Sequence, residues 1–319
     1  MKTTNFPNGM TSQGMPVVGG GMPFTFGTYY YVNPNGNGGN GLSADSPFST
    51  IAEAYAACVS NKDDVIVLST NSAHAVTAML DVSKNRVHFV GDQFGRAFGQ
   101  RARITMGITT VATDIAVMKN TGVGNTFTGI KFDSSNTKDE SLYAVAEGGE
   151  YAVYNSCEFY KSTDLDESLA AELLHNGDST TYRNCTFGSN VGVIAGAIIR
   201  PCVLLTRETL TGKVSRDGLF DNCRFWRFAG NTANAFIWST LATDVERCLE
   251  VRDCIFNVTA KSTAVPAVAI GGVSAFTSGE ILLTGSTGEN GCTAFATQTG
   301  IFSMLSDFAA TGGSGVQSS

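Results

Sequence analysis

The residues best suited to chemistry are acidic and lie close together near the middle of the chain. Asp164, Asp166 and Glu167 fall within one short segment, downstream of Asp133, Asp139 and Glu140 in other segments expected to be loops. Grouped carboxylates could bind Ca²⁺ or take part in polysaccharide cleavage. We favour a structural interpretation, in which the group of 164–167 begins a helix over residues 168–174, because acidic residues stabilise the positive end of a helix.

The histidines do not form a recognisable catalytic pattern. His88 alternates with apolar residues in the segment 86–90, which predicts a strand with His88 on its solvent side. His175 follows two leucines at the end of the helix-like run, where it would cap the helix. No phosphate-binding loop and no nucleophile elbow occurs, so we expect no catalytic residue, no cofactor and no bound metal. Trp226 and Trp238 are interpreted as core or interface residues.

Eight cysteines are present, and none of them is spaced as Cys-x-x-Cys. The absence of that spacing gives no support to a zinc ribbon. Residues 1–21 contain no apolar stretch of the kind found in a secretory signal. We therefore favour buried free thiols over a disulfide framework, which is the alternative that an even number of cysteines leaves open.

A six-residue pattern recurs along the chain. It consists of an apolar residue, a variable residue, a small or polar residue, Cys or Ile, a second variable residue and Phe. The copies are residues 127–132, 154–159, 182–187, 220–225 and 251–256. Their Cys or Ile positions, at 130, 157, 185, 223 and 254, are 27, 28, 38 and 31 residues apart. A coil of three short strands and three turns has about this length, so the repeat predicts an all-β parallel β-helix.

Strand geometry predicts which residues of the repeat are buried. Residues two apart on a strand face the same side, so the Cys and the Phe of each copy point inward together. The small or polar residue before each Cys fits a bend in the backbone. The predicted core ladder consists of Cys157, Phe159, Cys185, Phe187, Cys223, Phe225, Cys254 and Phe256.

The front of the chain resembles the N-terminal cap of pectate-lyase-like right-handed β-helices. The resemblance lies in a strand at 29–33, a Gly- and Asn-rich loop at 34–45, an Ala-rich helix near 49–60 and a buried strand at 64–68. Ser49 or Thr50 could cap this helix. The resemblance implies a right-handed parallel β-helix over residues 29–260, with the helix closing the open end of the stack. Residues 261–319 are either further coils or a C-terminal module and tail.

Residues 1–17 resemble the start of β-helix proteins carried by tailed bacteriophages. This resemblance implies a virion protein made in the host cytoplasm, with an extended N-terminal arm over residues 1–28. The arm would dock on the major capsid protein or another virion protein, and the protein would be a homotrimer. The candidate docking residues are Phe6, Met10, Met15, Pro16 and Val17.

The composition excludes several classes of protein. The 319 residues carry a formal net charge of −7, and only 15% of them are charged. A nucleic-acid partner is disfavoured, because phosphate binding needs a basic surface. A membrane-spanning helix is disfavoured as well, since no stretch approaches about 20 apolar residues.

Three functions remain to be weighed. We favour a capsid decoration or cement protein. The alternative is a tailspike or receptor-binding fibre that binds or cleaves a host surface glycan. A bacterial polysaccharide lyase is the least favoured, because the sequence lacks an export signal. The Gly-His-Gly and Arg-x-Lys elements of the glycoside hydrolases that share this fold are also missing.

Overall fold

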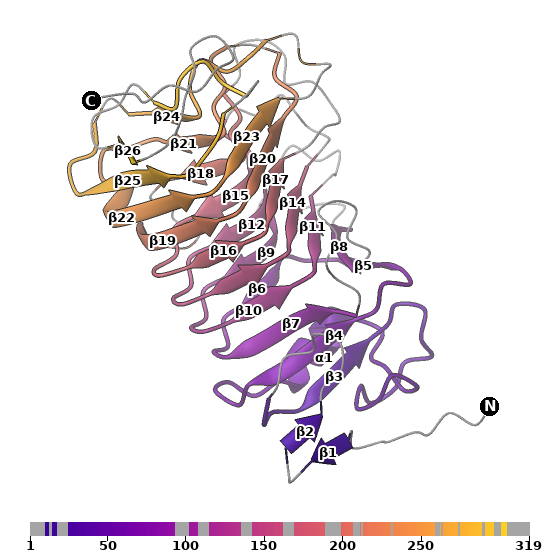
Figure 1. Ribbon diagram of the computed structural model, residues 1–319. Coiled ribbons are helices and arrows are strands. Elements are labelled where there is room, and N and C mark those ends of the chain that lie inside the picture. Colours follow the sequence, from indigo (N-terminus) through magenta and orange to yellow (C-terminus); the bar gives the residue numbers. More distant parts are fainter. Residues whose placement is uncertain are drawn as a thin grey trace.

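The computed structural model describes residues 10–12, 15–17, 25–92, 102–107, 115–134, 142–161, 169–188, 199–206, 211, 213–230, 232–258, 262, 264–273, 275–288, 291–296 and 301–304. Within these residues, the strands form three long parallel sheets and one two-stranded antiparallel sheet. The chain visits the three parallel sheets in turn, so each strand pairs with its counterparts in the neighbouring coils (Figure 1). The predicted all-β parallel solenoid is therefore confirmed.

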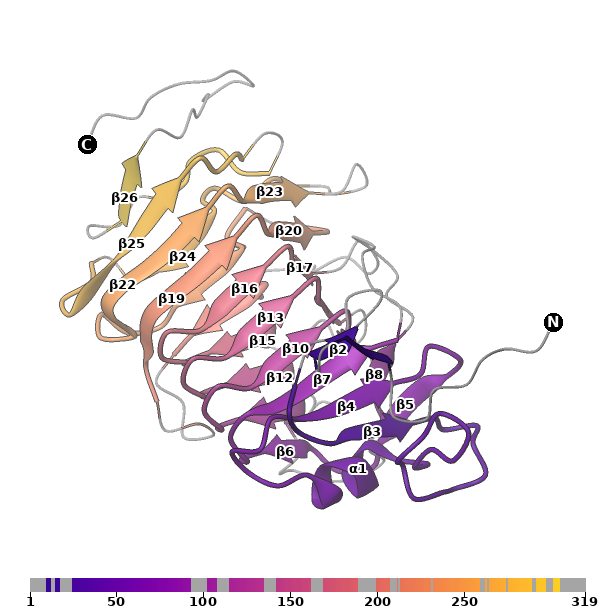
Figure 2. The same ribbon diagram turned by 60° about the horizontal axis from the view of Figure 1, so that its bottom comes forward.

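Each parallel sheet forms one side of an elongated stack, with the N-terminal strands at one end and the C-terminal strands at the other (Figures 1 and 2). The first sheet contains β3 (Tyr29–Val32), β4 (Asp64–Leu68), β7 (Val87–Gly91), β10 (Thr126–Thr128), β13 (Val153–Asn155), β16 (Thr181–Arg183), β19 (Ser215–Asp221), β22 (Val245–Arg252), β25 (Gly279–Thr284) and β26 (Ile301–Met304). The second sheet contains β5 (Ala73–Val76), β8 (Arg103–Met106), β11 (Lys131–Asp133), β14 (Glu158–Tyr160), β17 (Thr186–Gly188), β20 (Arg224–Arg227) and β23 (Ile255–Val258). The third sheet contains β6 (Leu80–Val82), β9 (Ala116–Asn120), β12 (Tyr143–Glu147), β15 (Ala171–His175), β18 (Val203–Leu205), β21 (Ile237–Ser239) and β24 (Ile270–Gly272).

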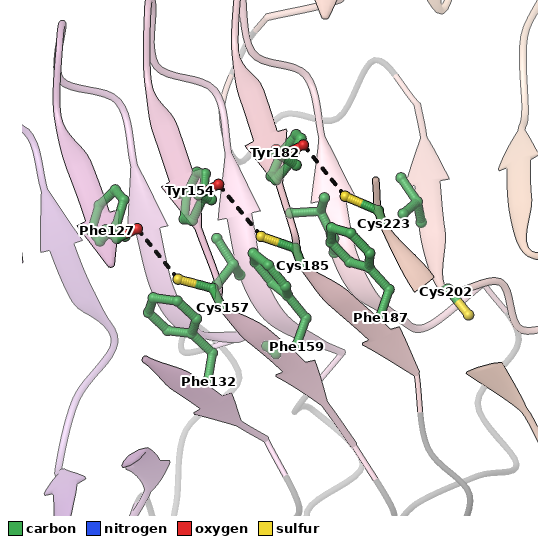
Figure 3. Close-up of a cluster of buried hydrophobic side chains, with 14 of the residues drawn as sticks. Phe127, Phe132, Tyr154, Cys157, Phe159, Tyr182, Cys185, Phe187, Cys202 and Cys223 are labelled. Atoms are coloured by element: carbon green, nitrogen blue, oxygen red, sulfur yellow. Dashed lines mark hydrogen bonds between the residues drawn. The ribbon is translucent and has the colours of Figure 1, made fainter. Parts of the chain in front are cut away.

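Aromatic side chains stack along the interior of the first and second sheets (Figure 3). In the second sheet, Phe159, Phe187 and Phe225 pair in register from coil to coil. The ring centroids of Phe159 and Phe187 are 4.6 Å apart, and those of Phe187 and Phe225 are 5.2 Å apart. Tyr154 and Tyr182 stack in the same way in the first sheet, at 5.1 Å. Each such pair contributes about 1 kcal/mol beyond the area that it buries.

The cysteines of the repeat line the corner between these two columns. The thiol of Cys185 donates to the carbonyl of Tyr154 in the preceding coil over 3.4 Å (Figure 3). Cys157, Cys223 and Cys254 each make the equivalent contact with a carbonyl of the coil that precedes their own. All eight cysteines are free, and all except the half-exposed Cys248 are buried. The prediction of buried free thiols is therefore confirmed at every cysteine but Cys248.

The chain turns from the first sheet to the second at a single residue with left-handed backbone geometry. Asn184 has a φ of 55°, Asn222 of 51° and Asp253 of 53°. Asn, Asp and Gly tolerate this region better than other residues, which explains the small or polar position before each cysteine. The N–H of Asn184 donates to the carbonyl of Asp221 in the next coil over 3.0 Å. The N–H of Asn222 donates in the same way to the carbonyl of Arg252 over 2.9 Å. The bend predicted at this position is confirmed.

Near the N-terminus, α1 (Ile51–Ala57) begins at the N-cap Thr50, whose side chain forms a capping box with Glu53. Ile51 and Ala54 are buried in the same core cluster as the strands. The Lys84 ammonium donates to the carbonyls of Tyr55 and Cys58, at 2.6 and 2.8 Å. It therefore provides hydrogen bonds to backbone carbonyls at the end of the helix. The closing role of this helix stays a prediction. No helix among the described residues is long and apolar enough to cross a membrane.

The predicted helix over residues 168–174 is wrong. Residues 171–175 form β15, which pairs with β12 on one side and β18 on the other. Ala, Glu and Leu are good helix formers, but helix propensity is a small energy, and parallel pairing on both sides overrides it. His175 consequently ends a strand rather than a helix, and its side chain is fully buried.

The C-terminal strands extend the same stack. β24 pairs with β21, and β25 pairs with β22 and β26. Ser286 takes the place of the repeat cysteine, because its hydroxyl donates to the carbonyl of Val251 in the preceding coil over 3.1 Å. The described part of residues 261–319 therefore consists of further coils.

At the opposite end of the chain, β1 (Met10–Ser12) and β2 (Met15–Val17) form a hairpin of their own. Met10 pairs with Val17, and Thr11 pairs with Pro16. This hairpin belongs to none of the three parallel sheets. It contains four of the five candidate docking residues, while Phe6 lies outside the described residues.

Candidate functional site

The acidic group predicted at residues 164–167 lies in a segment that the structure does not describe. Asp164, Asp166, Glu167, Asp139 and Glu140 lie outside the described residues. Among the residues that are described, no three His, Cys, Asp or Glu side chains gather as a metal site would require. The hypothesis of a Ca²⁺ or catalytic site at 164–167 therefore stays a prediction.

The histidines have structural surroundings. His88 lies on the outer face of β7, where Nδ1 is 2.8 Å from the Thr126 hydroxyl and Nε2 is 3.4 Å from an Asp63 carboxylate oxygen. The Nδ1 of His175 is 3.0 Å from the Tyr182 hydroxyl. Burial lowers the pKa of His175 to about 3, so the ring is neutral at physiological pH. His74 is also buried, and Nε2 lies 2.8 Å from the carbonyl of Ser69.

A buried carboxyl group, Glu147, ends β12 beside the interior of the stack. The Asn120 amide donates to both of its oxygens, at 3.0 and 2.9 Å, and the Gly149 N–H donates over 2.6 Å. The Tyr154 hydroxyl donates to Oε2. Burial raises the pKa of Glu147 to about 7, although these hydrogen bonds oppose the shift. Asn120, Glu147 and His175 stand in register in β9, β12 and β15, so they form a polar column inside the core.

A second buried group, Arg227, is paired with a carboxylate. The Arg227 guanidinium donates two hydrogen bonds to the Glu172 carboxylate, at 3.1 and 2.7 Å. The side chains are 2% and 0% exposed. This buried pair joins β15 of the third sheet to β20 of the second sheet. Removal of either partner would strongly destabilise the fold, because the other charge would be buried alone. Neither Glu147 nor Glu172 was singled out from the sequence. The available signal was an acidic residue within an otherwise apolar strand.

The outer face of the second sheet holds a cluster of reactive side chains. The Lys131 ammonium lies 3.3 Å from Glu158 and 3.8 Å from Asp133. It also lies 3.5 Å from the centroid of the Tyr160 ring. Lys131 and Glu158 come from neighbouring strands and are in register. Their side chains are 12% and 7% exposed, so this cluster combines an amine, two carboxylates and a phenol near the surface.

The outer face of the ten-stranded first sheet carries side chains in regular rows, of which Val65, Val67 and Val90 near the N-terminal end are buried. Two rows of side chains run along it, because alternate residues of each strand point outward. The rows are Tyr29, Val65, His88, Thr126, Val153, Thr181, Leu219, Glu250 and Leu282, and Tyr31, Val67, Val90, Thr128, Asn155, Arg183, Asp221, Arg252 and Thr284. Charged side chains occur in the rows from Arg183 to Arg252, and the rows end on the uncharged Leu282 and Thr284.

The charges on this face pair between coils. Asp221 accepts from Arg183 and Arg252, each over 3.1 Å. Hydrogen bonds from these two guanidinium groups hold the pKa of Asp221 below its ordinary value. Exposed pairs contribute little to stability, but opposite charges in adjacent strands favour one register over a shifted one.

Both tryptophans are half-buried. Trp238 lies in β21 and packs against a small apolar cluster on the outer face of the third sheet, which includes Leu174 and Leu204. Trp226 lies in β20, in register with Gly188 and Asn257. The two side chains belong to different sheets, so they do not form one aromatic surface.

Comparisons with known proteins bear on the fold. No family model and no curated protein matches the sequence. Among solved structures, the pectate lyase Pel9A is 15% identical with a TM-score of 0.56, and the match covers 81% of this chain and 62% of that chain. A pectin methylesterase from Aspergillus niger is 13% identical with a TM-score of 0.55, over 89% of this chain and 82% of that chain. A pectin methylesterase from carrot is 12% identical with a TM-score of 0.52, over 90% and 91%.

These identities are too low to transfer an activity, because one scaffold hosts many functions. They do establish the architecture: this chain has the pectate-lyase-like right-handed parallel β-helix fold.

Proposed function

We propose that this protein is a structural component of a bacteriophage virion that decorates the capsid, and that its N-terminal arm anchors it. One observation supports the proposal above others. The hairpin of β1 and β2 is a sheet of its own and adds no strand to the solenoid. We expect a segment that adds no strand to the core to pair with another protein, and its sequence resembles the opening of phage β-helix proteins.

The scaffold suits such a role. Its three sheets form an elongated body whose outer faces present side chains in regular rows, as described for the first sheet. We expect a homotrimer, since virion parts of this kind are commonly symmetric oligomers. The partner would be the major capsid protein or another virion protein.

The test is co-sedimentation of the purified protein with capsids that lack it. The full chain should sediment with the shell in a fixed ratio, and a variant without residues 1–24 should stay in the supernatant. The circular dichroism of both should match, which would show that the solenoid is still folded. Equal sedimentation of the two proteins would exclude the arm as the anchor, and no sedimentation of either would exclude capsid decoration.

A tailspike or receptor-binding fibre that acts on a host glycan is the second candidate. It is supported by the Lys131, Asp133, Glu158 and Tyr160 cluster on the second sheet. General acid–base chemistry on a sugar polymer needs carboxyl groups near the surface. Digestion of host surface polysaccharide by the native protein, lost in Glu158→Gln, would favour this candidate. Adsorption of phage blocked by the free protein would favour a binding role.

A further inference from the structure

The Gly- and Asn-rich loop between β3 and α1 contains three Asn-Gly steps, at Asn35, Asn37 and Asn40. All three asparagines are exposed. An Asn-Gly step is open to an intramolecular reaction, because glycine has no side chain to shield its backbone nitrogen. The three steps have the same Asn-Gly dipeptide and exposed asparagines, so we compare them by the hydrogen bonds of their backbones.

Two of the three glycine N–H groups are held in hydrogen bonds. The Gly36 N–H donates to the carbonyl of Asn33 over 2.9 Å. The Gly41 N–H donates to the carbonyl of Ser46 over 2.8 Å. The Asn40 side chain is held as well, since its Oδ1 accepts from the Leu42 N–H over 3.1 Å. These hydrogen bonds hold the backbone nitrogens of Gly36 and Gly41, which would have to attack the preceding asparagine side chain. They also hold the side-chain amide of Asn40, which would be attacked.

The step at Asn37 is different. Within the described part of this loop, no hydrogen bond holds the Gly38 N–H or the Asn37 amide. Gly38 has a φ of +66°, a conformation that glycine adopts without strain. On one side the Gly36 N–H donates to the carbonyl of Asn33, and on the other the Gly39 N–H donates to the carbonyl of Pro47 over 2.7 Å. Asn37 and Gly38 lie between these two hydrogen bonds.

We propose that Asn37 is a site of spontaneous deamidation, selected by the fold over the other Asn-Gly steps of the loop. The Gly38 nitrogen loses its proton to solvent base and attacks Cγ of Asn37. The bond from Cγ to Nδ2 breaks, and ammonia leaves with a proton from water. The resulting succinimide is opened by water at either carbonyl, which gives aspartate or isoaspartate. No oxidant, metal or second protein is required.

The modification would change the surface at one end of the stack. The loop covers the free edge of β3, because the Tyr31 N–H donates to the carbonyl of Gly41 and the Phe48 N–H donates to the carbonyl of Tyr31. A new carboxylate at residue 37 would make the formal net charge of −7 one unit more negative. The protein would therefore acquire charge on this loop with age.

The experiment is to incubate the folded protein at neutral and mildly alkaline pH and to locate deamidation by fragment mass spectrometry. Asn37 should convert fastest, and faster as the pH rises. Asn35 and Asn40 should convert about five- to tenfold more slowly, since each reaction must first break a hydrogen bond. Asn176, which is 1% exposed and donates to Thr211 over 3.0 Å, should stay intact.

Two controls make the result decisive. In denaturant the steps at 35, 37 and 40 should convert at similar rates, which would assign the selectivity to the fold. Asn37→Gln should abolish the fast phase, whereas Asn35→Gln and Asn40→Gln should keep it. Conversion of Asn35 or Asn40 as fast as Asn37 in the folded protein would overturn the proposal, as would an Asn37 that is no faster than Asn176.

Discussion

At the scale of single residues, Glu147 should make stability depend on pH. Its pKa is raised to about 7 by burial, against about 4.3 for an unfolded glutamate. The folded state therefore holds the proton more tightly between these values. The contribution of Glu147 to the free energy of unfolding is greatest below about pH 4.3. It is lost as the pH rises through about 7, by up to about 4 kcal/mol.

Urea unfolding of the native protein and of Glu147→Gln at a series of pH values isolates this group. The native protein should lose stability relative to the variant as the pH rises from about 5 to about 8. Asp221, whose pKa is lowered, changes stability in the opposite direction but is common to both proteins and cancels. Parallel curves for the two proteins would contradict the assignment to Glu147.

The cysteines of the repeat lead to a second prediction at this scale. Ser286 already occupies the repeat position in one coil and makes the same donor contact. Cys185→Ser should therefore fold and lose no more than about 1 kcal/mol. Cys185→Asp should not fold, because a carboxylate there would be buried without a partner. Thr181→Asp is the matched control, since Thr181 lies on the outer face of the same coil between Val153 and Leu219, and it should fold. A folded, soluble Cys185→Asp would contradict the register of the repeat.

At the scale of elements, the turn from the first to the second sheet should select its residue by backbone geometry. Asn222 has a φ of 51° and its side-chain amide donates to Asn184 over 2.7 Å. Asn222→Val should lower the free energy of unfolding by about 1–2 kcal/mol, whereas Asn222→Gly should be nearly neutral. Asn155→Val, on the outward face of β13, is the control and should be tolerated. Thermal unfolding of the three variants checks the ranking.

The repeat made the coil register accessible from the sequence, because a Cys and a Phe two residues apart can share a face only in a strand. Elements outside that pattern are harder to predict from the sequence. Residues 171–175 have a local preference for helix, and only their pairing with β12 and β18 makes them a strand. Local sequence does not contain that information. The same limit applies to Glu172, whose partner Arg227 is 55 residues away.

At the scale of the whole molecule, the stability of each coil depends on its contacts with the coils on either side. The stack should therefore unfold as one unit only if these contacts are kept. The coils after residue 258 cover the last repeat: Phe256 contacts Phe295 at a centroid distance of 6.3 Å, and β25 pairs along β22. Ending the chain at residue 258 would expose these side chains and leave β22 and β23 as open edges. Open, apolar edges pair with other chains.

We therefore expect the protein shortened to residues 1–258 to aggregate or to unfold at a clearly lower temperature than the full chain. A chain ending at residue 304 keeps all the strand pairs described above and serves as the control. It should unfold in one transition, at the temperature of the full chain. Light scattering and calorimetry on the three proteins distinguish the outcomes. If the chain of 258 residues is soluble and unfolds like the full chain, β24 to β26 form a dispensable module, and the continuity of the core across the C-terminal coils contributes little to stability.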